Sequence, residues 1–161
     1  MKLRLLATPL LATGLLLSTL GCSKKEDAKP TANTGSYKLD NTLYTCQAKA
    51  SVTSYTSGNF SYDRLIIDLV TTPTPATGAE TLHLSFIKDN NPLNNSYALF
   101  DVVLTTKGTP TPYFFSVDHT SVTPTSSGGF SGTFSANISS LYGTPPPYTG
   151  ITDGTFTDVH P

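Results

Sequence analysis

Carboxylates and histidines are the side chains of this sequence that could catalyse a hydrolysis. Glycoside cleavage usually needs two facing carboxyl groups, one of which acts as the acid. The glutamates are Glu26 and Glu80, and the aspartates considered for such a pair are those at positions 63, 68, 101, 118, 153 and 158. Most of these aspartates fall at the ends of predicted strands or on their polar faces, so the pattern favours no catalytic pair.

A Ser-His-Asp site would need one of the three histidines. His83 alternates with the apolar residues of its segment and is expected to face solvent. His119 directly follows Asp118, and neighbours on a strand point to opposite faces. His160 is the penultimate residue and is expected to fray. The sequence therefore predicts no catalytic triad.

Metal and phosphate motifs are weaker still. The segment DNN at 89–91 and the segment TDGTFTD at 152–158 offer oxygen ligands, but neither matches a calcium loop. Gly128 and Gly129 lack the lysine of a phosphate-binding loop. Within 152–158, Asp153-Gly154 is expected to form a turn or a bulge before the last strand. We predict no metal site and no cofactor.

The two cysteines have different expected roles. Cys22 follows Gly21 at the end of an apolar run, where a thiol can be alkylated by a diacylglycerol donor. Cys46 shares its parity with Tyr44 and Ala48, while its direct neighbours are polar, which places it on the inward face of a strand. With Cys22 acylated, Cys46 has no disulfide partner, and we expect it to pack as a small hydrophobic residue.

Residues 1–21 have the layout of a secretory signal peptide, with Lys2 and Arg4 before an apolar stretch. A membrane-spanning helix needs about 20 apolar residues, and this stretch is shorter and is interrupted by Pro9 and Gly14. A signal peptide is therefore the better interpretation.

The end of this stretch resembles the bacterial lipoprotein signal, although Thr19 stands where that signal prefers leucine. The resemblance implies cleavage between Gly21 and Cys22 and attachment of acyl chains to Cys22. Two or more chains anchor a protein stably in a membrane.

Residues 22–35 are polar after the cysteine and predict a flexible tether. Lys24, Lys25, Glu26 and Asp27 resemble the surface-export signal of lipoproteins in the Bacteroidota. The resemblance implies the outer face of the outer membrane, with the periplasmic face of that membrane as the alternative.

The composition after the signal peptide limits the partners. Removal of residues 1–21 leaves 140 residues with 8 basic and 11 acidic side chains, a net charge of −3. This balance gives no footprint for nucleic acid or for an anionic membrane surface. Threonines outnumber acidic residues more than twofold, which suits strands.

Residues 36–161 read as one all-β domain. Short alternating runs are separated by clusters of Pro, Gly, Asn and Asp, and Asp40-Asn41 is expected to form a two-residue hairpin turn. No helical periodicity is present. The expected strands are 36–39, 42–52, 62–70, 80–87, 97–106, 112–118, 130–138 and 151–159. About eight short strands at this spacing predict an antiparallel β-sandwich, with a flattened β-barrel as the alternative.

Three of these strands have clear inward faces, and the expected inward residues are Leu65, Ile67 and Leu69, then Leu82, Leu84 and Phe86, then Phe100, Val102 and Leu104. The opening GSYKLDNTLYTC and the ending GGFSGTFSANI…ITDGTFTDV together resemble small uncharacterised surface lipoproteins of the Bacteroidota. The resemblance implies an all-β fold and a surface location, and it implies no activity.

We therefore expect a non-catalytic cell-surface lipoprotein that binds a glycan or a protein. The long connections at 71–79, 88–96, 105–112 and 142–150 are expected to carry recognition. Exposed aromatic rings could bind sugars, or they could cap the ends of the core; the candidates are Tyr55, Phe60, Tyr62, Tyr142 and Tyr148. One alternative is a structural subunit of a surface assembly, which predicts an exposed apolar patch or an unpaired edge strand. The other is a hydrolase, which would require Asp153, Asp158 and His119 to line one cleft.

Overall fold

The computed structural model describes residues 31–58, 60–72, 78–89, 96–107, 111–139 and 148–161. The elements of this part of the chain are β1 (Thr34–Leu39), β2 (Thr42–Ser57), β3 (Phe60–Thr71), β4 (Thr81–Asp89), β5 (Ala98–Thr105), β6 (Tyr113–Pro124), β7 (Phe130–Ile138) and β8 (Gly150–Val159). Among these residues, no helix is long and apolar enough to span a bilayer. The first strand begins two residues before the predicted start of the domain.

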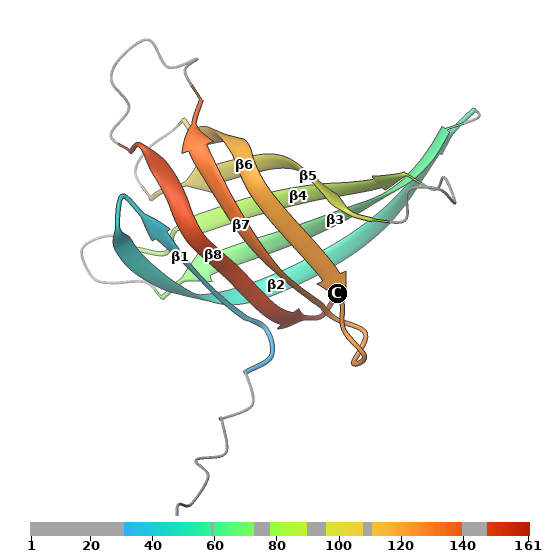
Figure 1. Ribbon diagram of the computed structural model, residues 1–161, viewed down its shortest axis with the longest axis horizontal. Coiled ribbons are helices and arrows are strands. Elements are labelled where there is room, and N and C mark those ends of the chain that lie inside the picture. The colour runs from blue at the N-terminus through green and yellow to red at the C-terminus, as the bar shows by residue number, and fades with distance from the viewer. Residues whose placement is uncertain (1–30, 59, 73–77, 90–95, 108–110, 140–147) are drawn as a thin grey trace, which may run out of the picture.

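The strands form one closed antiparallel barrel (Figure 1). Each strand pairs with the next along the chain, and β8 pairs with β1 to close the ring. The predicted all-β class with eight antiparallel strands is confirmed, and of the two expected architectures the barrel is the one found.

The turn between β1 and β2 forms where the sequence predicted a hairpin. Asp40 and Asn41 have φ angles of 47° and 68°, the left-handed conformation that Asn and Asp tolerate and that a two-residue turn requires. The Asp40 carboxylate also accepts hydrogen bonds from the backbone N–H of Thr149 at 2.8 Å and of Gly150 at 3.2 Å. The turn is thereby fixed to the start of β8.

The barrel interior is filled by the inward side chains of all eight strands. The expected inward residues of β3 and β4 are buried, and Cys46 is a free cysteine with 5% of its surface exposed. The buried hydrophobic residues are Tyr37, Leu39, Cys46, Ala48, Leu65, Ile67, Leu69, Leu82, Leu84, Phe86, Val102, Leu104, Phe115, Phe134, Ala136, Ile151, Phe156 and Val159. The interior is therefore a packed core.

Two strand pairings, β5–β6 and β1–β2, stop short of one end of the barrel. β5 and β6 pair only from Val102 to Leu104 on β5, and β1 pairs only with the first part of β2, from Thr42 to Gln47. In Figure 1, β5 and β6 diverge accordingly from the end where they pair. The barrel is thus flattened, and at the divergent end it resembles two layers. This shape explains why strand spacing alone could not separate a barrel from a sandwich.

Two irregularities change which side chains face inward. Phe100 was predicted to face inward, but this is wrong: it lies 68% exposed. The β4–β5 register shifts between Ser85 and Phe86, so that the bulged strand turns Phe100 outward. Asp153-Gly154 was expected to form a turn or a bulge before the last strand; it forms a bulge, but within β8, because the register of β8 with both neighbours shifts there and Asp153 has a φ of 51°.

The β2–β3 hairpin is longer than the sequence pattern predicted. β2 continues to Ser57 and β3 begins at Phe60, and Gly58 takes a φ of 60° in the turn between them. Ser51 to Ser57 are all exposed. In Figure 1 this hairpin extends at the upper right beyond the other strands. We call Ser51–Ser57 the projecting half of β2.

Candidate binding site

Three aromatic side chains gather at the end of the projecting hairpin. Tyr55 lies directly opposite Tyr62, and Ser57 lies opposite Phe60. Directly paired residues share a face of a sheet, as do residues two apart on one strand. Tyr55, Phe60 and Tyr62 therefore lie on one face of the hairpin, and we call them the aromatic tip. The sequence placed them in or beside loops; the structure places them in strands.

The aromatic tip is ordered by ring stacking and is open to solvent. The ring centroids of Tyr55 and Tyr62 are 5.1 Å apart with an interplanar angle of 21°. Tyr55 is 42% exposed and Phe60 is 80% exposed. An offset stack of this kind contributes about 0.5–1.5 kcal/mol beyond the buried area. The stack holds two rings in fixed orientations without covering them.

Polar groups lie beside the aromatic tip on the same outer face. The register places Asp89 of β4 opposite Tyr62, and Arg64 of β3 one row further along the hairpin. The Arg64 Nε–H donates to the hydroxyl of Ser85 at 2.9 Å, and Ser85 is fully buried. The outer face therefore offers aromatic rings of the hairpin bordered by the carboxylate of Asp89 on β4 and the guanidinium group of Arg64 on β3.

The inward face of the same hairpin is stabilised by a polar cluster instead of a core. The Ser54 hydroxyl donates to the Asp63 carboxylate at 2.6 Å, and Lys88 lies 3.5 Å from the other oxygen of Asp63. The Lys88 ammonium also lies 5.3 Å from the centroid of the Tyr97 ring. These contacts explain how the hairpin keeps its shape beyond the hydrophobic interior.

The other aromatic candidates do not join the tip. Tyr148 packs against the core, and its ring meets that of Tyr113 edge to face at a centroid distance of 5.2 Å. It therefore takes the capping role that the sequence offered as the alternative. Tyr142 lies outside the described residues. Most of the four long connections predicted to carry recognition also lie outside them.

Two of the three residues required for a hydrolase line one hollow. His119 and Asp153 border a hollow of about 400 Å³ together with residues of β7 and β8. The Asp153 carboxylate is paired with the Lys38 ammonium at 2.8 Å. Asp158 is not among the residues that line this hollow. The three side chains therefore do not converge on one cleft.

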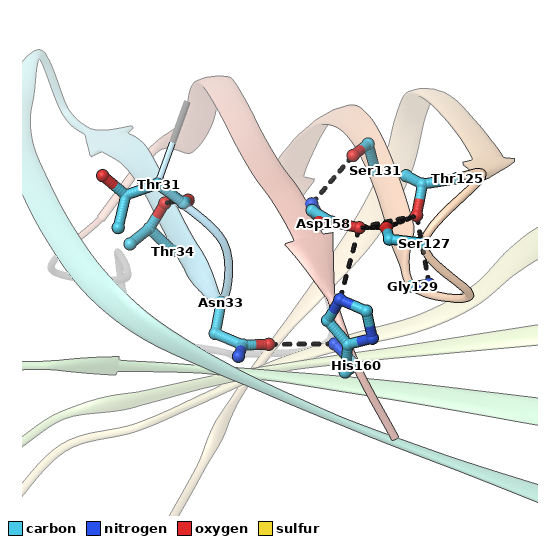
Figure 2. A network of polar contacts seen from close by, with 9 residues as sticks. All are labelled: Thr31, Asn33, Thr34, Thr125, Ser127, Gly129, Ser131, Asp158 and His160. Atoms are coloured by element: carbon cyan, nitrogen blue, oxygen red, sulfur yellow. Dashed lines mark hydrogen bonds and ion pairs between the residues drawn. The ribbon is translucent and has the colours of Figure 1, made fainter. Parts of the chain in front are cut away.

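Asp158 instead joins the end of β8 to the turn between β6 and β7 through its carboxylate (Figure 2). Its carboxylate accepts hydrogen bonds from the hydroxyls of Thr125, at 2.6 Å, and Ser127. These hydrogen bonds, with a smaller contribution from His160, lower the pKa of Asp158 below its ordinary value. A carboxylate engaged in this way stabilises the β6–β7 turn.

The expectation that His160 frays is wrong. Its backbone N–H donates to the side-chain oxygen of Asn33 at 2.9 Å, and its Nε2 lies 3.4 Å from the Asp158 carboxylate (Figure 2). Asn33 in turn donates its backbone N–H to the Asp158 carbonyl oxygen at 3.2 Å. The end of β8 is therefore tied to the residues just before β1.

One carboxylate–imidazole pair was missed by sequence reasoning. His83 lies on the outward face, as predicted, and its Nδ1 is 2.7 Å from the Asp68 carboxylate. The pair forms because the β3–β4 register places the two residues directly opposite each other. The nearby Ser85 hydroxyl is fully buried and bonded to Arg64, so a nucleophilic serine does not complete a triad there.

A row of hydroxyl groups crosses the outer face of β6, β7, β8, β1 and the first part of β2. Five residues directly opposite one another make this row: Ser121, Thr133, Thr155, Ser36 and Thr45. Hydrogen bonds join Ser121 to Thr133 at 3.0 Å and Ser36 to Thr155 at 3.1 Å. These mutual bonds are what a solvated threonine-rich sheet face is expected to form, and the row points to no ligand.

The described part of the chain holds no group of three or more His, Cys, Asp or Glu side chains that could bind a metal ion. The predicted signal cleavage site at Gly21 and Cys22, and the export residues Lys24 to Asp27, lie outside the described residues. The fold and the tip together define an eight-stranded antiparallel barrel with a projecting aromatic hairpin. Comparison of the chain with protein-family models, with curated proteins and with solved structures found no match.

Proposed function

We propose that this chain is a non-catalytic lipoprotein of the outer membrane, anchored through acyl chains on Cys22, and that its barrel presents a glycan-binding surface at the aromatic tip. The observation that carries the proposal is the position of three aromatic rings on one face of a hairpin that extends beyond the core. The Phe60 ring is 80% exposed, so little of its surface is used in packing.

A glycan fits this surface better than an apolar ligand. Flat aromatic faces stack on the apolar faces of sugar rings, while adjacent charged groups can hydrogen-bond to sugar hydroxyls. Asp89 and Arg64 are the groups beside the tip that could do so. The protein after the signal peptide is nearly neutral, with a net charge of −3, which suits a ligand without strong charge.

The test compares two exposed phenylalanines on different parts of the barrel. The chain from residue 23 onward would be applied to a glycan array and to envelope polysaccharide, as wild type, Phe60→Ala with Tyr62→Ala, and the control Phe100→Ala. We expect the double variant to lose about tenfold or more in affinity, and Phe100→Ala to bind like the wild type. Binding that survives the double variant would contradict the tip as the site.

A hydrolase-substrate panel on the same samples addresses the enzymatic alternative. Turnover of a substrate without stable retention of any glycan would refute the binding function. For the anchor, Cys22→Ala should leave an uncleaved precursor that takes up no labelled fatty acid. Normal maturation of that variant would contradict the lipoprotein assignment.

Surface location is tested on intact cells. Protease added outside should cleave the wild-type protein, and replacement of Lys24, Lys25, Glu26 and Asp27 by alanine should protect it by retaining it on the periplasmic face. Equal protection of both proteins would favour the periplasmic alternative for the wild type.

A second candidate function, a structural subunit of a surface assembly, is favoured by a different observation. Phe100 on β5 and Val117 on β6 are 68% and 38% exposed, and they lie on the two strands that diverge. Val117 has inward parity through its pairing with Ala136, yet β5 has moved away from it. Retention of envelope proteins alone, with no glycan bound, would favour this function.

A further inference from the structure

The edge of β2 that faces away from β3 loses its partner halfway along the strand. β1 pairs with β2 only as far as Gln47, and the last contact on this edge is the hydrogen bond from the Ala48 N–H to the Asn33 carbonyl at 2.9 Å. β2 continues for nine residues beyond Ala48, paired only with β3. Residues 50–56 therefore form an unpaired edge in the described part of the chain, which we call the free edge.

The direction of the unpaired groups follows from strand geometry. Because the Ala48 N–H points to the β1 side, the N–H and C=O groups of every second residue point the same way. These residues are Ala50, Val52, Ser54 and Thr56. The β2–β3 register runs without a shift to Ser57, so no bulge interrupts this row of groups.

The free edge has none of the features by which natural proteins protect an edge strand. Those features are charged side chains, prolines and bulges. The free edge contains none of them, and consists of Ala, Ser, Val, Thr and Tyr. The unpaired part of β6, by contrast, contains a bulge at Val117–His119 and ends in Pro124. The free edge is therefore the part of the described barrel best suited to strand addition.

A second copy of this chain satisfies the free edge completely. If two free edges pair antiparallel about Thr53, Ala50 lies opposite the partner's Thr56 and Val52 lies opposite the partner's Ser54. The N–H groups on each edge then face the C=O groups on the other edge, and the reverse. On the outer face, Thr53 meets its own copy, and Thr–Thr pairs are favourable across strands. The edge carries no charge, so no like charges oppose each other.

We propose that the free edge of β2 joins two copies of this protein in a two-fold symmetric dimer through a continuous antiparallel sheet. Such an edge-to-edge contact keeps the outer faces of both copies on the same side. The two aromatic tips then lie on one surface. The dimer does not depend on the tip binding a glycan, because it uses backbone groups on the edge and not the aromatic faces.

The first experiment compares two threonines of the same strand and the same outer face. Thr45 and Thr53 are both exposed on β2, but only Thr53 lies on the free edge. The full acylated chain in detergent would be oxidised as wild type, Thr45→Cys and Thr53→Cys. We expect Thr53→Cys to form a disulfide-linked dimer at least about tenfold faster than the wild type or Thr45→Cys, because the two introduced cysteines face each other in the dimer. Equal rates for the two variants would overturn the proposal.

The second experiment uses charge. Thr53→Lys and Thr53→Glu each place like charges opposite each other in the dimer, and both lie at an exposed position that should not disturb the barrel. Sedimentation equilibrium should show the wild type as a dimer, each variant alone as a monomer, and the mixture as a heterodimer. A wild type that stays monomeric up to about 100 μM, or a mixture that stays monomeric, would overturn the proposal. An unchanged circular dichroism spectrum of each variant controls for folding.

Discussion

The two halves of β2 belong to one continuous strand and have different surroundings. In the first half, Thr42 to Ala48, the strand is paired with β1, and from Cys46 onward it is also paired with β3; Cys46 and Ala48 are buried. In the projecting half, Ser51 to Ser57, it is paired on one side and every residue is exposed. The alternation of small or apolar residues with polar ones runs from Tyr44 to Val52, and so continues past Ala48, the last buried residue of the strand. Alternation thus reports the geometry of a strand, while burial requires that another layer cover its inward face.

Val52 illustrates the difference within one strand. It shares the inward parity of Cys46 and Ala48 and is paired with the buried Leu65, yet it is 40% exposed. The layer that would cover it is missing because β1 has ended and β6 has diverged from β5. The end of β1 also leaves the free edge without a partner.

The largest expected effect is the loss of stability of the protein when a buried aromatic residue of the barrel interior is replaced. Phe86 in β4 is fully buried, and its ring meets Phe156 edge to face with centroids 6.0 Å apart. Phe86→Ala should lower the free energy of unfolding by about 3–5 kcal/mol, whereas Phe60→Ala at the tip should change it by about 0.5 kcal/mol or less. Urea denaturation of the chain from residue 23 onward measures both. Similar losses would show that the tip is packed.

The reactivity of one thiol in each half of β2 compares the two environments within a single strand. Burial raises the pKa of Cys46 to about 11, so at pH 8 its thiolate fraction should be about 100-fold or more below that of an ordinary cysteine. Val52→Cys in a Cys46→Ala background should be labelled correspondingly faster by a thiol reagent. In denaturant the two proteins should react equally. Fast labelling of Cys46 in the native protein would contradict its burial in the core.

The smallest expected effect concerns the pH dependence of stability at the two ends of β2. Hydrogen bonds from Thr149 and Gly150 lower the pKa of Asp40 in the folded state. The stabilising contribution of this carboxylate is therefore complete above the ordinary aspartate pKa near 3.9, and it is lost as the pH falls below that value.

Asp40→Asn should therefore flatten the loss of stability between about pH 5 and pH 2. The measurement is the urea midpoint as a function of pH. The matched variant is Gly58→Asn in the turn at the other end of β2, where no side chain or backbone lies near. It should leave the acid slope unchanged. If Asp40→Asn leaves the pH dependence of the urea midpoint unchanged, the Asp40 carboxylate does not stabilise the fold in this way.

Much of the fold could be predicted from the sequence, and less of the candidate site. Alternation identified the eight strands and the inward residues of β3 and β4, because a period of two is a local property of the backbone. It could not show the Asp68–His83 pair or the Tyr55–Tyr62 stack, since each depends on the register between two strands. It also misplaced Phe100, because the bulge beside it interrupts the alternation.

The sequence by itself determined the class of structure: strands, their approximate limits, the Asp40-Asn41 turn and the buried position of Cys46. These follow from local conformational preference and from which side chains avoid water. Only the tertiary structure decided between a sandwich and a barrel, and it alone showed where β2 loses its partner. The reason is physical: strand closure, divergence and an unpaired edge depend on how far neighbouring strands remain in contact, and this is a property of pairs of segments distant in the chain.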